Sequence, residues 1–261
     1  MMLTTPIPRD RRNVWFCVPS ARPAAEANVA LDKWRAMGYR IAIFDESDEV
    51  DAKTKDAYIT GMPYPGYAKA VNLLVKAVLL VDKNCDWIVT GGDDTYPDPD
   101  HLPRDIAYDC ADHFAVPARR GPSAFDNAPT FGIMQPTGDR FADGCIDRIC
   151  GSPWMGREFC ERINQGNGPM WPEYRHMFPD EELFEVAKSL GVLWQRRDLV
   201  HYHNHFMRAN TSLTSHAVST APPPFLREAN SPQHWAEFKG KYTARKAANF
   251  PGHEPLMAVT A

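Results

Sequence analysis

Long apolar runs are missing from this sequence. No apolar stretch in its 261 residues approaches the roughly 20 residues that a membrane-spanning helix needs. The charged N-terminal segment, residues 1–12, is not followed by the apolar region of a cleaved secretion signal. We therefore expect a protein without a transmembrane segment, located in the cytoplasm.

Cysteine pairs and an excess of positive charge are also missing. The six cysteines are scattered and include no CxxC pair, which favours reduced thiols over a disulfide framework or cysteine-bound zinc. A formal net charge of −4 provides no overall basic field for nucleic acid, although a few arginine clusters offer local patches. With 44% apolar and 24% charged residues, the composition is that of a globular protein. We expect one domain over residues 1–215, followed by a proline-containing tail, 216–261, that packs on it or stays mobile.

The first part of the chain predicts a strand, a helix and a second strand. Residues 14–18 and 40–44 are apolar runs, and residues 24–37 between them have apolar side chains at helical spacing. Such a βαβ unit implies a parallel pair of strands. Ligands of parallel sheets bind at the carboxyl ends of the strands, so Pro19-Ser20 and Asp45 are predicted to lie on one rim.

The rest of the chain alternates between helical and strand patterns, which predicts an α/β fold. Predicted helices cover residues 67–81, 153–163, 180–190 and 232–241; predicted strands cover residues 87–90, 114–116, 131–135, 192–195 and 198–202; residues 51–65 and 164–178 are predicted loops.

An acidic turn follows the strand predicted over residues 87–90. Two glycines and two prolines force the turn, and Asp93 and Asp94 are adjacent within it. Neighbouring carboxylates repel each other unless a cation or hydrogen-bond donors compensate them. Mg²⁺ or Mn²⁺ would suit, because each prefers oxygen ligands and fills its remaining positions with water and phosphate oxygens. The alternative is an Asp-rich surface turn, for which Asp98 and Asp100 are good candidates.

Residues 66–72 and 86–94 resemble the pattern of family 2 glycosyltransferases, in which a helix carrying an Arg-Asn pair leads into a strand and a DxD-type turn. Asn72 matches the asparagine of that pair, whereas Val71 stands where arginine is usual. Lys69 lies in the same stretch, and both Lys69 and Asn72 are candidates for contacts with the nucleotide-sugar donor.

Residues 14–22, followed by residues 43–47, resemble the opening strand of that family and its Asp-Asp-Gly-Ser nucleotide-binding loop. A glutamate and no glycine follow the first aspartate here, which departs from the pattern. By this resemblance Pro19, Ser20 and Arg22 belong to the donor site.

The resemblance implies a GT-A fold, which is a Rossmann-like α/β domain with a mixed, mainly parallel sheet flanked by helices. It also implies that Asp45 contacts the nucleotide base, Asp93 the ribose and Asp94 the metal. The expected donor is a nucleotide diphosphate sugar, most simply a UDP-sugar, and the expected cofactor is Mn²⁺ or Mg²⁺.

Residues 179–183 resemble the Glu-Asp-x-x-Leu segment of the family, whose aspartate is the general base. Asp180 takes that place, although Pro179 replaces the glutamate. A base is needed because an alcohol is a poor nucleophile until its proton is being removed. Asp180 also suits a helix N-cap, so Glu181 remains an alternative base.

His201, His203 and His205 alternate along the chain, which places them on one face if the segment is a strand. That spacing suits metal coordination, and the resemblance makes His201 or His203 the best candidates for a metal ligand or pyrophosphate contact. Hydrogen bonding to the backbone or exposure to solvent is the alternative, with His205 the first to be dropped.

Trp154 and Trp171 are candidates for the acceptor side, because flat rings stack on sugar faces; burial in the core is the alternative. The acceptor itself stays open between a saccharide, a lipid-linked group, a protein and a modified nucleic acid. The resemblance thus implies a metal-dependent glycosyltransferase that inverts the anomeric configuration of the transferred sugar.

Three rival functions have specific requirements. A nucleotidyltransferase usually has a glycine-rich loop with Lys or Arg after its first strand, and residues 19–23 contain no glycine. A metallohydrolase built on the three histidines leaves Asp93 and Asp94 unexplained. A non-catalytic nucleotide-sugar-binding module would have the donor site without a working base.

Overall fold

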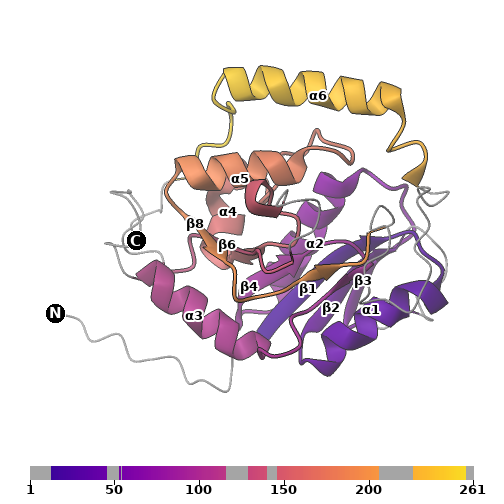
Figure 1. Cartoon of the computed structure of the whole chain (residues 1–261), viewed down its shortest axis with the longest axis vertical. Helices are drawn as coiled ribbons and strands as arrows, with labels where there is room; N and C mark the ends of the chain where they lie inside the picture. Colours follow the sequence, from indigo (N-terminus) through magenta and orange to yellow (C-terminus); the bar gives the residue numbers. More distant parts are fainter. Residues whose placement is uncertain are drawn as a thin grey trace.

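The structure is a computed structural model that describes residues 13–45, 53, 55–115, 129–139, 146–205 and 226–256. Its main sheet has seven strands in the order β3-β2-β1-β4-β7-β6-β8 (Figure 1). The strands are β1 (Asn13–Ser20), β2 (Arg40–Asp45), β3 (Ala57–Ile59), β4 (Cys85–Thr90), β6 (Ile133–Pro136), β7 (Trp154–Gly156) and β8 (Leu193–Arg196). The helices are α1 (Ala24–Ala36), α2 (Tyr67–Val81), α3 (Pro103–Ala115), α4 (Arg157–Gly166), α5 (Pro179–Ser189) and α6 (Pro232–Ala247).

The sheet is mixed and mainly parallel. β7 runs antiparallel to its neighbours β4 and β6, and every other neighbouring pair is parallel. The predicted α/β class, with helices flanking the sheet, is therefore confirmed. The carboxyl ends of β1, β2 and β4 meet on one rim, where a second sheet of only two strands, β5 (Thr95–Tyr96) and β9 (Tyr202–His203), also lies.

Two apolar cores cover the two faces of the sheet. On β1, Trp15 and Cys17 face the core formed with α2, α4 and α5, whereas Phe16 and Val18 face the core formed with α1 and α3. Because both faces are covered, the strand is a continuous apolar run rather than an alternating one. Among the described residues, no helix combines the length and the apolar character needed to cross a bilayer.

Two sequence predictions are wrong around α3 and β3. Phe114, predicted to begin a strand, lies near the end of α3, and no helix was predicted over residues 103–115. Ile106, Cys110 and Phe114 are buried at a spacing of four residues, which makes the inner face of this helix. The rest of the predicted strand, from residue 116, lies outside the described residues. The predicted loop over residues 51–65 contains β3, whose three residues are too few to give a strand pattern.

The helix predicted over residues 153–163 starts later than expected. Trp154–Gly156 forms the central strand β7, and the helix begins at Arg157. Gly156 is required here, because an added Cβ would lie 1.9 Å from the carbonyl oxygen of Thr130. A strand of three residues that leads directly into a helix is too short to show an alternating pattern of its own in the sequence.

Candidate active site at the carboxyl rim

Arg22 connects the two carboxylates of the acidic turn. Its Nε donates to Asp93 Oδ1 at 2.7 Å, and its Nη2 donates to Asp94 Oδ2 at 2.6 Å. Ser20, at the end of β1, donates its hydroxyl to Asp93 Oδ2 at 2.7 Å. The ends of β1 and β4 therefore supply both the anions and the donors that compensate them.

The two aspartates differ in their electrostatics. Burial raises the pKa of Asp93, the Arg22 guanidinium opposes this only in part, and the adjacent Asp94 carboxylate raises it further. Burial also acts to raise the pKa of Asp94, but His203 and Arg22 outweigh it and hold that pKa below its ordinary value. Asp94 is thus the more firmly ionised carboxylate, as a metal ligand has to be.

His203 contacts Oδ1 of the Asp94 carboxylate, whereas Arg22 donates to its Oδ2. Its Nε2 is 3.1 Å from Asp94 Oδ1, because the β5–β9 ladder pairs Thr95 with His203. Two adjacent ligands of an octahedral ion, each about 2.1 Å from the metal, are separated by about 3 Å. An added Cβ on Gly92 would lie 2.5 Å from Asp94 Oδ1 and 3.6 Å from His203 Nε2, so glycine keeps this space open. Asp94 and His203 therefore fit a divalent cation.

No cluster of three or more Asp, Glu, His or Cys side chains that suits a metal occurs within the part of the chain that the structure describes. A cation held by Asp94 and His203 would take its other ligands from water and substrate. That is the coordination Mg²⁺ shows when it binds together with a phosphate group.

His201 does not join this group. It is buried, its Nδ1 is 2.8 Å from Ser152 Oγ, and its Nε2 accepts a hydrogen bond from Trp154 Nε1 at 3.4 Å. Burial lowers the pKa of His201 to about 4, so the ring is neutral. His205, which the sequence ranked last, lies beside His203 with ring centroids 4.9 Å apart. The three histidines do not share one face of a strand as expected, because β9 contains only Tyr202 and His203.

A second ion pair lies at the end of β2. Lys53 Nζ is 2.9 Å from Asp45 Oδ1, with both side chains fully buried, and it also donates to Ser20 Oγ at 3.4 Å. A chain of polar contacts therefore runs from Asp45 to Asp93. The sequence analysis missed Lys53, whose only signal is a lysine inside an acidic stretch. Pro19 pairs with Phe44 in the β1–β2 register, one residue before the rim.

Asn72 and Lys69 lie apart from the acidic turn. The Asn72 amide donates to the Met170 carbonyl at 2.7 Å, and its oxygen accepts from the Met170 amide at 3.0 Å. Asn72 therefore holds the loop before α5, and its predicted donor contact stays a prediction. Lys69 is exposed on the first turn of α2.

The candidate base lies on the same rim as the acidic turn. The Tyr67 hydroxyl is 3.4 Å from Thr90 Oγ1 and 3.5 Å from the Gly91 carbonyl oxygen, immediately before the turn. Burial raises the pKa of Tyr67, and the charge of Asp180 raises it further, which places Asp180 within electrostatic range of that ring. The Cys150 amide donates to the Asp180 carbonyl at 3.0 Å, and the Ser152 hydroxyl donates to the Thr90 carbonyl at 3.0 Å, so the start of α5 lies near the end of β4.

Asp180 and Glu181 form a coupled carboxyl pair. Burial, followed by the charge of Asp180 and a hydrogen bond with it, raises the pKa of Glu181 to about 9. Glu181 is consequently protonated at neutral pH. Burial also lowers the pKa of the nearby His176, a second titratable neighbour that the sequence analysis missed.

The two tryptophans assigned to the acceptor differ in their surroundings. Trp154 has no exposed surface and packs in the core with Phe16 and Trp34, so its ring is not accessible to a sugar. Trp171 is half-buried, and the Arg245 guanidinium lies 3.6 Å from its ring centroid. The core alternative is correct for Trp154.

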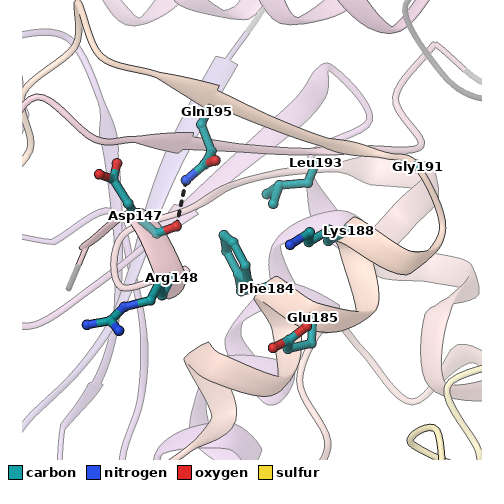
Figure 2. A pocket seen from close by; sticks show the side chains of 8 residues that line it. All are labelled: Asp147, Arg148, Phe184, Glu185, Lys188, Gly191, Leu193 and Gln195. Atoms are coloured by element: carbon teal, nitrogen blue, oxygen red, sulfur yellow. Dashed lines mark hydrogen bonds between the residues drawn. The ribbon is translucent and has the colours of Figure 1, made fainter. Parts of the chain in front are cut away.

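A separate cavity of about 590 Å³ lies between α5 and the edge strand β8 (Figure 2). Phe184 and Leu193 turn toward it, and the Gln195 amide donates to the backbone carbonyl of Asp147 at 3.0 Å. None of the rim residues described above lines this cavity, so it is distinct from the rim site.

Comparisons with known proteins give likenesses of fold only. No protein-family model matches the chain, and no curated protein matches it. Similar solved structures include the catalytic domain of Drosophila beta1,4-galactosyltransferase 7 with xylobiose, at 15% identity and a TM-score of 0.46, covering 78% of this chain and 76% of that one. A mutant of that protein in complex with manganese, UDP-Gal and xylobiose has 14% identity and a TM-score of 0.45, with the same coverage of 78% and 76%. A putative glucose-1-phosphate thymidylyltransferase from Bacillus anthracis has 9% identity and a TM-score of 0.41, covering 72% and 88%. Function has to be inferred from the site itself.

Proposed function

We propose that this protein is a metal-dependent glycosyltransferase that transfers a sugar from a UDP-sugar to a hydroxyl acceptor with inversion. The observation that carries the proposal is the presence of two different acidic groups on one rim. Asp93 and Asp94 both accept hydrogen bonds from Arg22, whereas Asp180 is followed by Glu181, whose pKa is raised to about 9.

On the donor side, Asp94 and His203 would hold Mn²⁺ or Mg²⁺, which neutralises charge on the departing diphosphate. The Arg22 guanidinium adds a fixed positive charge at the same rim, which favours an anionic ligand there. The resemblance assigns the ribose to Asp93 and the nucleotide base to Asp45. Asp45 forms a fully buried ion pair with Lys53, with 2.9 Å between Oδ1 and Nζ.

On the acceptor side, Asp180 accepts the proton of the attacking hydroxyl as that oxygen approaches the anomeric carbon. Glu181, which is protonated at neutral pH, lies beside Asp180 in the first turn of α5. The hydroxyl oxygen forms the new glycosidic bond while the bond to the diphosphate breaks. A single displacement of this kind inverts the anomeric centre.

The proposal is tested by measuring the melting temperature with a panel of nucleotide sugars, with and without Mn²⁺. A ligand at 100 times its Kd stabilises the folded state by about 2.7 kcal/mol, which corresponds to about 5–11 °C for a chain of this size. We expect the largest increase with a UDP-sugar plus Mn²⁺. Asp94→Asn should lose the Mn²⁺-dependent part, and the control Asp100→Asn, an exposed acid in the same stretch, should keep it.

Two results contradict the proposal. The donor site is wrong if no nucleotide sugar raises the melting temperature, or if Asp94→Asn responds as the wild type does. In a turnover assay, release of pyrophosphate from a nucleoside triphosphate and a sugar phosphate would identify a nucleotidyltransferase instead.

A further inference from the structure

The C-terminal helix α6 lies over α5, on the side away from the main sheet (Figure 1). Phe238 is the one side chain of α6 that is buried. A helix with so small an apolar face is held by specific contacts rather than by general burial. Those contacts converge on the first turn of α5, which carries the candidate base.

The strongest contact is a buried ion pair between Arg245 and Glu182. Arg245 Nη2 donates to Glu182 Oε1 at 2.6 Å, and Arg245 Nε donates to Glu182 Oε2 at 2.9 Å. The Tyr174 hydroxyl donates to the same carboxylate at 2.7 Å. The Arg245 and Glu182 side chains are 11% and 4% exposed, so solvent does not replace either partner. Glu182 follows the carboxyl pair directly in the sequence.

A second contact holds the residue before α5. Phe178, which precedes Pro179, has a φ of +75°, a left-handed conformation that costs free energy for a residue other than glycine. Its ring stacks on Tyr242 at 5.3 Å between centroids and contacts Trp235 at 5.9 Å, both from α6. A strained conformation persists only where the surroundings hold it, and here two rings of α6 do so.

We propose that Arg245 and Tyr242 are positioning residues for the candidate base: from α6 they hold the first turn of α5, which carries Asp180. This inference rests on the proposed role of Asp180 in catalysis. Arg245 acts through Glu182, and Tyr242 acts through Phe178.

The protonation of the carboxyl pair depends on the same contacts. The charge of Asp180 acts on the pKa values of Tyr67, Cys150, His176 and Glu181, and the charge of Glu181 acts on that of Tyr242. Burial is the largest cause of the raised pKa of Glu181, and the Tyr242 ring of α6 stacks on Phe178, three residues before it. Loosening α6 admits water to Glu181 and lowers its pKa toward the ordinary value. Glu181 then ionises at a lower pH and repels Asp180.

Amide hydrogen exchange of the whole protein tests the structural part directly. The reporter is the Glu182 amide, which donates to the Phe178 carbonyl at 3.0 Å. In Arg245→Ala we expect this amide and those of residues 183 and 184 to exchange at least about tenfold faster, because a buried carboxylate has lost its partner. The control is Lys246→Ala, whose ion pair with Glu185 is half-exposed and should leave them unchanged.

A second variant keeps the test decisive if Arg245→Ala does not fold. Tyr242→Leu removes the ring that stacks on Phe178 but keeps the ion pair, and it should accelerate exchange of the Glu182 amide in the same way. Unchanged exchange at the Glu182 amide in a folded variant overturns the inference. Equal acceleration of the β1 and β4 amides also overturns it, because the effect is then global.

The pH dependence of sugar transfer tests the catalytic part. In the wild type, ionisation of Glu181 should make activity fall near pH 9, which gives the pH profile a basic limb. In Arg245→Ala this basic limb should move to lower pH by about one unit or more. Arg245→Lys, which keeps the charge, should recover part of the shift. A lower rate with an unmoved limb would mean that the residue is merely structural. Absence of transfer in the wild type would contradict the proposed function, while hydrogen exchange would still decide the positioning role.

Discussion

Replacing Arg22 by methionine should destabilise the protein strongly at neutral pH. The Arg22, Asp93 and Asp94 side chains are 15%, 10% and 14% exposed, so water cannot replace the guanidinium well. Removing one partner from a buried charge group costs about 3–5 kcal/mol. For a domain of this size, that loss lowers the melting temperature by about 6–20 °C.

The sign of the pH dependence follows from the two aspartates. In the wild type the pKa of Asp94 is lowered, so its contribution is present above the unfolded pKa of about 3.9 and is lost as pH falls through the folded value. Without Arg22 the pKa values of both carboxyls rise, and the variant gains protons at a higher pH than the wild type does. The difference in melting temperature should therefore be largest near pH 7 and narrow toward pH 4.5.

Calorimetric melts of both proteins at pH 7 and pH 4.5 measure this difference. Arg104→Met is the matched control, because the Arg104 and Asp105 side chains are 61% and 60% exposed and such pairs contribute less than about 1 kcal/mol. If Arg22→Met melts within about 2 °C of the wild type at pH 7, the carboxylates are not buried against this arginine and the reasoning fails.

Two further substitutions test the space around Asp94 and the state of Glu181. Gly92→Ala places a Cβ 2.5 Å from Asp94 Oδ1, so it should abolish the Mn²⁺-dependent rise in melting temperature; Gly240→Ala, with no neighbour within 4 Å, should keep that rise and add about 0.5–1 kcal/mol of stability. An unchanged Mn²⁺ response in Gly92→Ala argues against a cation at this carboxylate. Because the folded pKa of Glu181 is raised to about 9, its stabilising contribution is complete below the unfolded value and lost as pH rises toward 9. Glu181→Gln should therefore melt at an increasingly higher temperature than the wild type between pH 5 and pH 9, and a difference that does not grow with pH would rule out the buried protonated carboxyl.

The elements that the sequence predicted well are those with an uninterrupted apolar pattern between glycine or proline residues. The helix predicted over residues 67–81 has the bounds of α2, and the first two strands match β1 and β2 within two residues. The pattern of α3 was present as Ile106, Cys110 and Phe114, but the polar residues between them obscured it. β3 and β7 have three residues each, too few for any period to show.

For the site, adjacency in sequence identified the acidic turn, but contacts between distant segments decided the other roles. Asn72 is held by Met170, 98 residues further along the chain, and this contact leaves no local pattern. His201 and His203 look equivalent in the sequence, yet one points at Ser152 and the other at Asp94. Only the packing of β9 against the turn distinguishes them.

The ladder that brings His203 to Asp94 contains just two residue pairs and does not belong to the main sheet. So short a ladder opens at a lower free energy than the seven strands beneath it. We therefore expect a substrate to enter and leave by local separation of β5 from β9, while both apolar layers stay closed. Substrate exchange would then require only local opening of the two-stranded sheet, while the seven-stranded sheet stays folded.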